Sequence, residues 1–389
     1  MCSEVLGRAN ASLVKTPAVI GHPRFVGPAV KRLGQFFGQQ LGGAWCCHMK
    51  CFGLMIAALL AAACSQAGAD AARSVGAASS ASSLDGDGYS DSMHLSVDDR
   101  VQDVLRHPAF AGHARLILPW DDRDYDEQMP LKFIGSLLPY HSHVEPRVVV
   151  GALNRMIDDA RRGQRVFYRF HSPAQRRNDP TKENTGLFYF RGNPGAPFAI
   201  IAPGGGFTYV GSIHEGFPYA MEISKRGYNA FVVRYRAGLG ERAATEDLAA
   251  AVSYLFRNAA ELGIETAGYS VWGSSAGARM VANIGSHGVQ RFGGDDLPKP
   301  SVVVMAYTAH SEYTTAEPPT FAVVGDHDGI APPVIMERRV AALLGHGTSV
   351  EYRKYNGVGH GFGLGTGTSA DGWVAEAVRF WDAVIKRGR

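Results

Sequence analysis

The stretch that decides the fold is 269-YSVWGSSAGARM-280, in which an apolar run passes through glycines and serines into a helical pattern. Gly273 to Gly277 fit the pattern G-x-S-x-G with Ser275 at its centre, and the pattern stands between a predicted strand and a predicted helix, as a serine nucleophile requires. Ser274 lacks this symmetric glycine spacing. Ser275 is therefore the candidate nucleophile, and the alternative is a turn whose serine only caps the helix.

Strand-like and helix-like segments alternate on both sides of this stretch. Residues 165–172 and 185–192 are short β-rich runs separated by a polar stretch, which predicts an antiparallel pair. The strands expected after them are 198–203, 230–236, 269–273, 301–307, 320–326 and 349–355. The helices expected between and after those strands are 216–227, 244–262, 276–285, 332–347 and 371–388. Strands apolar on both faces, alternating with helices, predict an α/β fold with a mostly parallel sheet covered on both sides.

A serine hydroxyl needs a base to take its proton and a third group to orient that base. Among the histidines after Ser275, only His360 lies in a late glycine-rich loop, GVGHGFGLG, directly after a predicted strand. The preceding strand ends in GDHDG, which offers Asp328 as the acid and Asp326 as the alternative. His327 stands between them and is expected to point away, because adjacent residues leaving a strand diverge.

The developing negative charge needs backbone N–H groups aimed at it. Ala276, directly after the serine at a helix N-terminus, is one candidate, and the loop APGGGFTYVG supplies Gly205 and Gly206 after an early strand. Glycine-rich loops also bind phosphates, but the chain has no G-x-x-x-x-G-K-[ST] motif. Weaker candidates for substrate contact are Phe207, Tyr209, His214 and Phe362, and residues 137–146 are a candidate lid segment.

Residues 165–389 resemble the α/β-hydrolase superfamily, and within it bacterial acetyl esterase/lipase-like enzymes. The motifs PGGGF, GSSAG, GDHD and GHGF look like that family's oxyanion, nucleophile, acid and histidine loops. Pro203 departs from the pattern, because the lipase-like branch usually has His there. The resemblance implies acyl transfer by Ser275, Asp328 and His360, with no metal and no organic cofactor. The acid and histidine loops also resemble those of dienelactone hydrolases and prolyl oligopeptidases.

The expected function is therefore hydrolysis of carboxylic esters, for example acetyl or feruloyl esters of carbohydrates. The alternatives are a serine peptidase of the prolyl-oligopeptidase type, a dienelactone-hydrolase-like enzyme, and a binding protein on the same fold without catalysis. A formal net charge of +3 and the lack of a basic stripe exclude nucleic acid as an expected partner. All thiols lie in the first 64 residues, so the body has no cysteine nucleophile.

The N-terminal region has the pattern of an export signal. The apolar run CFGLMIAALLAAAC is too short to span a bilayer, has the length of a signal-peptide core, and ends like a lipoprotein signal at Cys64. An ordinary signal peptide cut a few residues later is the alternative. We expect an exported protein whose only membrane contact is a lipid on Cys64. The predicted organisation is an upstream extension (1–48), a signal peptide (49–64), a disordered linker (65–92), a helical extension (93–164) and the catalytic domain (165–389).

Overall fold

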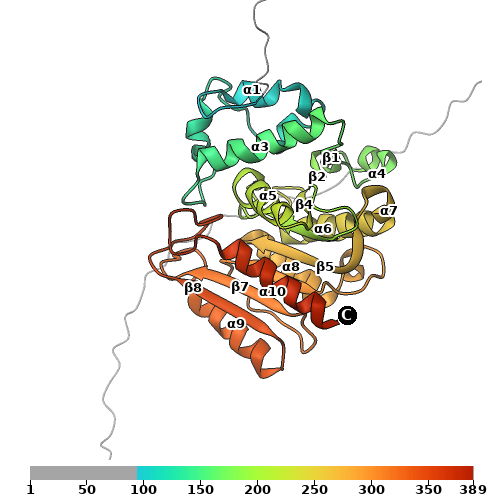
Figure 1. Cartoon of the computed structure of the whole chain (residues 1–389), viewed down its shortest axis with the longest axis vertical. Helices are drawn as coiled ribbons and strands as arrows, with labels where there is room; N and C mark the ends of the chain where they lie inside the picture. Colours follow the sequence, from blue (N-terminus) through green and yellow to red (C-terminus); the bar gives the residue numbers. More distant parts are fainter. Residues whose placement is uncertain (1–93, 389) are drawn as a thin grey trace, which may run out of the picture. The chain divides into compact units, whose positions relative to one another are not determined.

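The computed structural model describes residues 94–388 (Figure 1). The predictions for residues 1–48, 49–64 and 65–92, including lipidation of Cys64, lie outside the described residues and stay predictions. None of the helices within 94–388 combines the length and the apolar character that crossing a membrane would need.

The described residues form one eight-stranded sheet in the order β1-β2-β4-β3-β5-β6-β7-β8. β1 and β2 pair antiparallel, and β2 pairs antiparallel with β4, whereas every other pairing is parallel. The predicted antiparallel beginning and parallel remainder are thus confirmed. The strands are β1 Phe167–Tyr168, β2 Gly186–Phe190, β3 Pro197–Ala202, β4 Asn229–Arg234, β5 Glu265–Ser274, β6 Val302–Ala306, β7 Thr320–Gly325 and β8 Val350–Tyr355.

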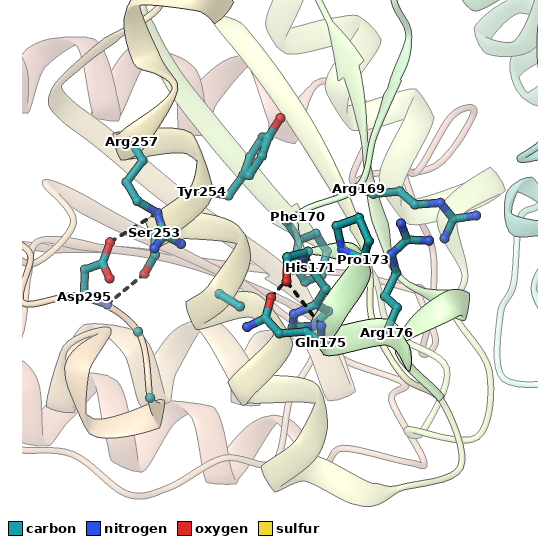
Figure 2. A pocket seen from close by; sticks show the side chains of 14 residues that line it. Arg169, Phe170, His171, Pro173, Gln175, Arg176, Ser253, Tyr254, Arg257 and Asp295 are labelled. Atoms are coloured by element: carbon teal, nitrogen blue, oxygen red, sulfur yellow. Dashed lines mark hydrogen bonds and ion pairs between the residues drawn. The ribbon is translucent and has the colours of Figure 1, made fainter. Parts of the chain in front are cut away.

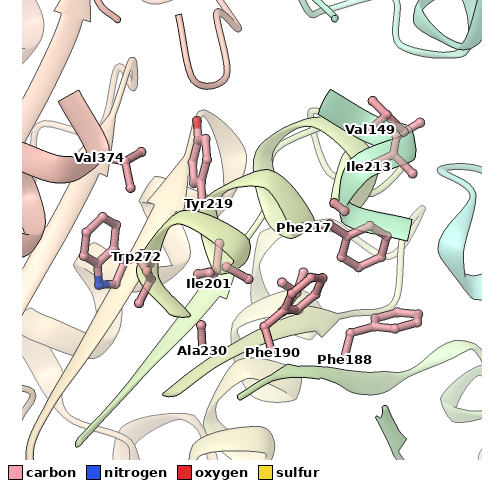
Figure 3. Packing of buried hydrophobic residues seen from close by; sticks show 14 of the residues in the cluster. Val149, Phe188, Phe190, Ile201, Ile213, Phe217, Tyr219, Ala230, Trp272 and Val374 are labelled. Atoms are coloured by element: carbon pink, nitrogen blue, oxygen red, sulfur yellow. The ribbon is translucent and has the colours of Figure 1, made fainter. Parts of the chain in front are cut away.

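The sheet is buried on both faces because successive strand residues point to opposite sides and both sets are apolar. On β3, Ala199 and Ile201 belong to one core cluster, whereas Phe198 and Ile200 belong to the other. Figure 3 shows the first cluster, in which Trp272 of β5 lies near Val374. A near-continuous apolar run in each central strand is therefore what places β5, and the serine after it, in the middle of the protein.

Helices cover both faces of the sheet (Figure 1). On the face of the first cluster lie α5 (Phe217–Lys225) and α10 (Trp373–Gly388), with α3 (Pro146–Arg161) packed on α5. On the other face lie α6 (Gly240–Arg257), α8 (Ala276–His287) and α9 (Pro333–Gly345). The sheet with helices on both faces agrees with the predicted fold class.

Several local predictions need correction. The strand expected over 165–172 is only β1, and the helix expected over 244–262 is broken at Asn258 into α6 and α7 (Ala259–Leu262). At the break, the backbone N–H and the side-chain amide of Asn258 both donate to the Tyr254 carbonyl. The polar stretch after β1 folds into α4 (Pro173–Asn178) and η3 (Pro180–Asn184), each with proline in its first turn.

The region before the sheet is helical but mostly in short pieces. They are α1 (Val101–Leu105), η1 (Pro108–Phe110), α2 (Ala114–Ile117) and η2 (Leu131–Leu137), followed by the long α3. The loop residue His113 packs this region onto the sheet, because its ring stacks on Phe167 of β1 at 4.7 Å between centroids and 4° between planes. Burial lowers the pKa of His113 to about 4, and its Nε2 has no hydrogen-bond partner among residues 94–388.

Replacing His113 by phenylalanine should weaken the acid dependence of stability. The unfolded histidine binds a proton below about pH 6.5, whereas the folded one stays neutral until about pH 4. The free energy of unfolding of the wild type therefore falls as pH drops through that window. H113F should make this fall less steep, by up to about 1.4 kcal/mol per pH unit, the value for one proton. Urea titrations between those pH values measure it.

The matched control is H327F, because the His327 side chain is 73% exposed. H327F should keep the wild-type pH dependence of unfolding. Equal slopes for the wild type and H113F would show that His113 does not contribute.

Candidate active site

The nucleophile turn joins β5 to α8, with Ser275 at its apex. Ser275 has φ 51° and ψ −115°, a conformation that a residue with a side chain adopts only under strain. The two flanking glycines make this turn possible. A Cβ on Gly273 would lie 2.3 Å from the Gly277 carbonyl oxygen, and one on Gly277 would lie 1.8 Å from the Ala202 carbonyl oxygen of β3. The spacing G-x-S-x-G is therefore a steric requirement of this turn.

Ser275, His360 and Asp328 form one hydrogen-bonded chain. His360 Nε2 lies 2.9 Å from Ser275 Oγ, and His360 Nδ1 lies 2.8 Å from Asp328 Oδ2. Asp328 and His360 are buried, whereas Ser275 keeps partial exposure. Because the ionised carboxylate only accepts, Nδ1 carries the proton and Nε2 is free to accept from the serine hydroxyl. This is the order of groups that activates a serine.

The choice between the two aspartates follows from their contacts. Asp328 Oδ1 accepts from the backbone N–H groups of Ile330 and Ala331, which leaves Oδ2 for His360. Asp326 instead accepts from the Gly357 N–H at 2.7 Å. The structure therefore brings Asp328 to His360 and leaves Asp326 in the loop scaffold.

The glycine loop after β3 runs against the nucleophile, since a Cβ on Gly204 would lie 2.9 Å from Ser275 Cβ. The Gly204 carbonyl accepts from the Gly211 N–H, and the Gly205 carbonyl accepts from the Thr208 and Tyr209 N–H groups. In a trans peptide the N–H points opposite to the C=O. These bonds therefore fix the directions of the N–H groups of Gly205 and Gly206.

Those two N–H groups, and that of Ala276, have no acceptor within the described part of the chain. The Ala276 N–H stands at the first residue of α8, where the helix dipole favours negative charge. The Gly204 N–H, in contrast, donates to Glu215 Oε2 at 2.5 Å. The predicted donors Gly205, Gly206 and Ala276 are thus available to an incoming anion, and Gly204 is not.

Three of the four predicted substrate-contact residues are buried, so that part of the prediction is wrong. Tyr209 and Phe362 are each 0% exposed, so no substrate atom reaches them. Tyr209 packs against Trp120, and Phe362 packs against Tyr307. His214 is also buried and bonds the Gly361 carbonyl through Nε2, and burial lowers its pKa to about 4. These side chains support the loops, and only Phe207 of the four is partly exposed.

A buried polar network that the sequence analysis did not identify lies behind the nucleophile. Glu215 Oε1 accepts from the Tyr307 hydroxyl at 2.9 Å and lies 3.0 Å from His141 Nε2. Tyr307 in turn bonds Tyr219, which accepts from Ser274 at 3.2 Å. Burial raises the pKa of Glu215, but the charge of His141 and its hydrogen bonds outweigh burial and hold that pKa at about 2. The carboxylate is therefore ionised.

The candidate lid segment lies directly against the histidine loop. Ser142 donates through Oγ to the His360 carbonyl at 2.7 Å and through its N–H to the Gly361 carbonyl at 2.9 Å. Gly361 has φ +68°, and a Cβ there would lie 2.5 Å from the Tyr140 carbonyl oxygen. The region before the sheet thus contributes residues to the wall of the site.

Backbone strain is concentrated around the same place. Within residues 94–388 the non-glycine residues with positive φ are His143, Phe207, Ser275 and Tyr307. Each belongs to the lid segment, the glycine loop, the nucleophile turn or the turn after β6. Strained backbone of this kind persists where the surroundings over-determine it, and it clusters at functional sites.

Two large surface hollows lie away from Ser275. One of 470 Å³ is bordered by Arg169, Arg176 and Arg257 and lies between the β1–α4 segment and α6 (Figure 2). Another of 550 Å³ lies between the loop before β4 and α10. Neither hollow is lined by Ser275, His360 or Asp328.

Comparison with known proteins finds similarity over parts of the chain. A family model described as BD-FAE matches residues 191–297, which hold the glycine loop and the nucleophile turn. The described residues have the topology of an α/β-hydrolase fold, a mostly parallel sheet with the serine turn at the end of the central strand β5. An endo-1,4-β-xylanase B from Butyrivibrio fibrisolvens is 32% identical over 93 residues, which are 23% of this chain and 14% of the xylanase. The chain thus spans about a seventh of that relative.

Similar solved structures match about half of the chain. An acetyl ester-xyloside bifunctional hydrolase from Caldicellulosiruptor lactoaceticus is 21% identical, with a TM-score of 0.46, over 51% of this chain and 88% of its own. A carboxylesterase from Lactobacillus plantarum is 20% identical, with a TM-score of 0.46, over 51% of this chain and 92% of its own.

Replacing Asp328 by asparagine should reverse the hydrogen bonding of His360. The amide oxygen of the new side chain can keep the two loop N–H groups, but its NH₂ then faces Nδ1 and forces the proton onto Nε2. The serine loses its base, so the rate at which a fluorophosphonate labels Ser275 should fall by about 10⁴-fold. Stopped labelling reactions followed by mass spectrometry measure that rate.

The matched control is D326N, since an amide oxygen can still accept from the Gly357 N–H. It should label at close to the wild-type rate. A large loss in D326N with none in D328N would reverse the assignment of the acid.

Proposed function

We propose that the protein is a serine hydrolase that cleaves carboxylic esters through an acyl-enzyme. The observation that carries the proposal is the 2.9 Å contact from His360 Nε2 to Ser275 Oγ, beside backbone N–H groups with no acceptor of their own among the described residues. A serine that only capped a helix would need neither a base nor an acid behind it.

In the first half of the reaction Ser275 Oγ attacks the ester carbonyl carbon while His360 Nε2 takes the hydroxyl proton. The charge on the carbonyl oxygen is stabilised by the N–H groups of Ala276 and of Gly205 or Gly206. Asp328 holds the imidazole and stabilises its charged form. The tetrahedral intermediate then expels the alcohol, which receives the proton from His360.

In the second half water attacks the acyl carbon. His360 removes a proton from that water, the same N–H groups hold the new oxyanion, and Ser275 leaves as the acid is released. Strain at Ser275 keeps Oγ at the apex of the turn in both halves. Besides water, both halves of the reaction use only the side chains and backbone groups described above.

We infer that the alcohol part is a carbohydrate and that the acyl part is acetyl or feruloyl. The support is the match to the BD-FAE model and to a segment of a xylanase. The site also offers a partly exposed aromatic surface. Tyr140 is 43% exposed, and its ring lies 3.1 Å from where a Cβ of Gly206 would stand. An aromatic ring at the mouth of the site suits stacking on a sugar or an aromatic acyl group.

The test is hydrolysis of p-nitrophenyl acetate and of acetylated and feruloylated xylo-oligosaccharides by the wild type, S275A and S274A. The wild type should turn over these esters, and S275A should lose at least about 10³-fold in kcat. S274A is the matched control, because the Ser274 hydroxyl donates to the buried Tyr219 and not to His360, so its loss should matter far less. Full activity in S275A would remove Ser275 from the mechanism. Inert behaviour on esters with cleavage of aminoacyl-arylamides would favour the peptidase alternative.

We also propose that the enzyme acts outside the cytoplasm, anchored by a lipid on Cys64. The support is the sequence pattern of residues 49–64 alone. Mass spectrometry of the mature N-terminus should find a chain that begins at a lipidated Cys64. A mature chain that begins at Met1 would contradict export.

A further inference from the structure

We propose that His141, from the lid segment before the sheet, is a positioning residue that holds the oxyanion loop through the buried Glu215 carboxylate. The proposal rests on the proposed serine hydrolase function and adds to it a group outside the three-residue chain. It assigns the region before the sheet a part in catalysis.

The His141 side chain is inserted into the site. It is 1% exposed, its Nε2 lies 3.0 Å from Glu215 Oε1, and its Nδ1 lies 2.9 Å from the Tyr209 hydroxyl. The Tyr209 hydroxyl, which accepts from the Tyr140 N–H, holds the other ring nitrogen of His141. Because an ionised carboxylate only accepts, His141 Nε2–H donates to Glu215. The imidazole therefore joins the lid segment to the carboxylate in one defined orientation.

Glu215 also contacts the glycine loop. It belongs to η4 (Ser212–Gly216), a wide π-helical turn that precedes α5, and it is 0% exposed. Its other oxygen accepts from the Gly204 N–H at 2.5 Å. A π-helical turn adds a residue to the helix, and such turns are frequent at functional sites. Here it aims an ionised side chain at the backbone that approaches Ser275.

Gly204 is held on each side, and its position sets the oxyanion donors. Glu215 takes its N–H and Gly211 donates to its C=O, so the peptide planes before and after Gly204 are both fixed. The second of those planes carries the Gly205 N–H. If Glu215 moved, the Gly204 N–H would lose its acceptor, and only the bond from the Gly211 N–H would still hold Gly204. Misdirected donors stabilise the transition state less, although the substrate still reaches the site.

His141 is what keeps Glu215 in that place. A buried carboxylate costs free energy unless it is paired and hydrogen-bonded. The other groups on Glu215 are the Tyr307 hydroxyl and the Gly204 N–H, both neutral. The other nearby imidazole, His214, bonds the Gly361 carbonyl instead. Removing His141 therefore leaves the carboxylate without its only basic partner within hydrogen-bond distance among the described residues.

The test compares H141F, which keeps a ring without a donor, with H141Q, which keeps a donor. Each is scored by the rate at which a fluorophosphonate labels Ser275, and by kcat and KM on p-nitrophenyl acetate. In labelling, Ser275 Oγ forms a bond to phosphorus, His360 takes the proton and fluoride leaves. H141F should lose about 10²-fold in labelling rate and in kcat, with KM little changed. H141Q should recover much of that loss.

The matched control is H171F. It breaks another buried contact of a histidine with a carboxylate, His171 Nε2 to Asp247 Oδ1 at 3.1 Å, and within residues 94–388 no hydrogen bond joins either residue to the glycine loop. H171F should lower the melting temperature but leave the labelling rate unchanged. A structural role for His141 alone would instead make H141F resemble H171F.

Each result is decisive. A folded H141F with the wild-type labelling rate overturns the proposal. If H141F does not fold, E215Q takes its place. Its amide has one acceptor oxygen, so its NH₂ must face either the Gly204 N–H or the His141 and Tyr307 donors. A wild-type rate in E215Q overturns the proposal as well. A wild type that labels at Ser275 but hydrolyses no ester refutes the ester hydrolase function. The labelling rates of H141F and H141Q then still test the positioning role of His141. A wild type that does not label refutes both.

Discussion

The structure depends on one constraint, the sharp turn that presents Ser275 between β5 and α8. The turn needs a positive φ at a residue that must carry a side chain, and it exists because β3 passes so close that only glycine fits at position 277. The strand pairing that brings β3 beside β5 requires both strands to be buried on both faces. The apolar strands, the covering helices and the nucleophile turn are therefore parts of one arrangement, and a change in any of them moves the serine hydroxyl.

Around that turn, polar groups are satisfied so that only the reactive ones remain free. Asp328 places one oxygen on two loop N–H groups and the other on His360. In the glycine loop, the carbonyls of Gly204 and Gly205 are occupied, which leaves two N–H groups facing outward. Preorganised donors of this kind need no rearrangement when charge develops, which is why they lower a barrier. The buried carboxylate of Glu215 bonds both the glycine loop and His141, so it links the oxyanion donors to the region before the sheet.

Much of this was predictable from the sequence, for reasons that are local. The periodicity of strands and helices predicted the sheet, and the glycine spacing selected Ser275 over Ser274. Each of these patterns lies within a short stretch of sequence. Asp328 and His360 followed from the order of loops after parallel strands. What the sequence did not reveal depends on distant packing. Nothing near Glu215 indicates that its carboxylate is fully buried, and nothing near His141 indicates its partner, since the two are brought together only by the fold. The same reason explains why Tyr209 and Phe362, which look like pocket residues, are core residues.

Ser275 must become covalently acylated during turnover, and trapping of the acyl-enzyme tests this. The wild type is mixed with p-nitrophenyl acetate, quenched in acid within milliseconds, digested and analysed by mass spectrometry. We expect a burst of nitrophenol matched by one acetyl group on the peptide that contains Ser275, localised to that serine. Acetylation of Ser274 or of a histidine instead, or turnover of the ester with no acetylated peptide at any quench time, would contradict it.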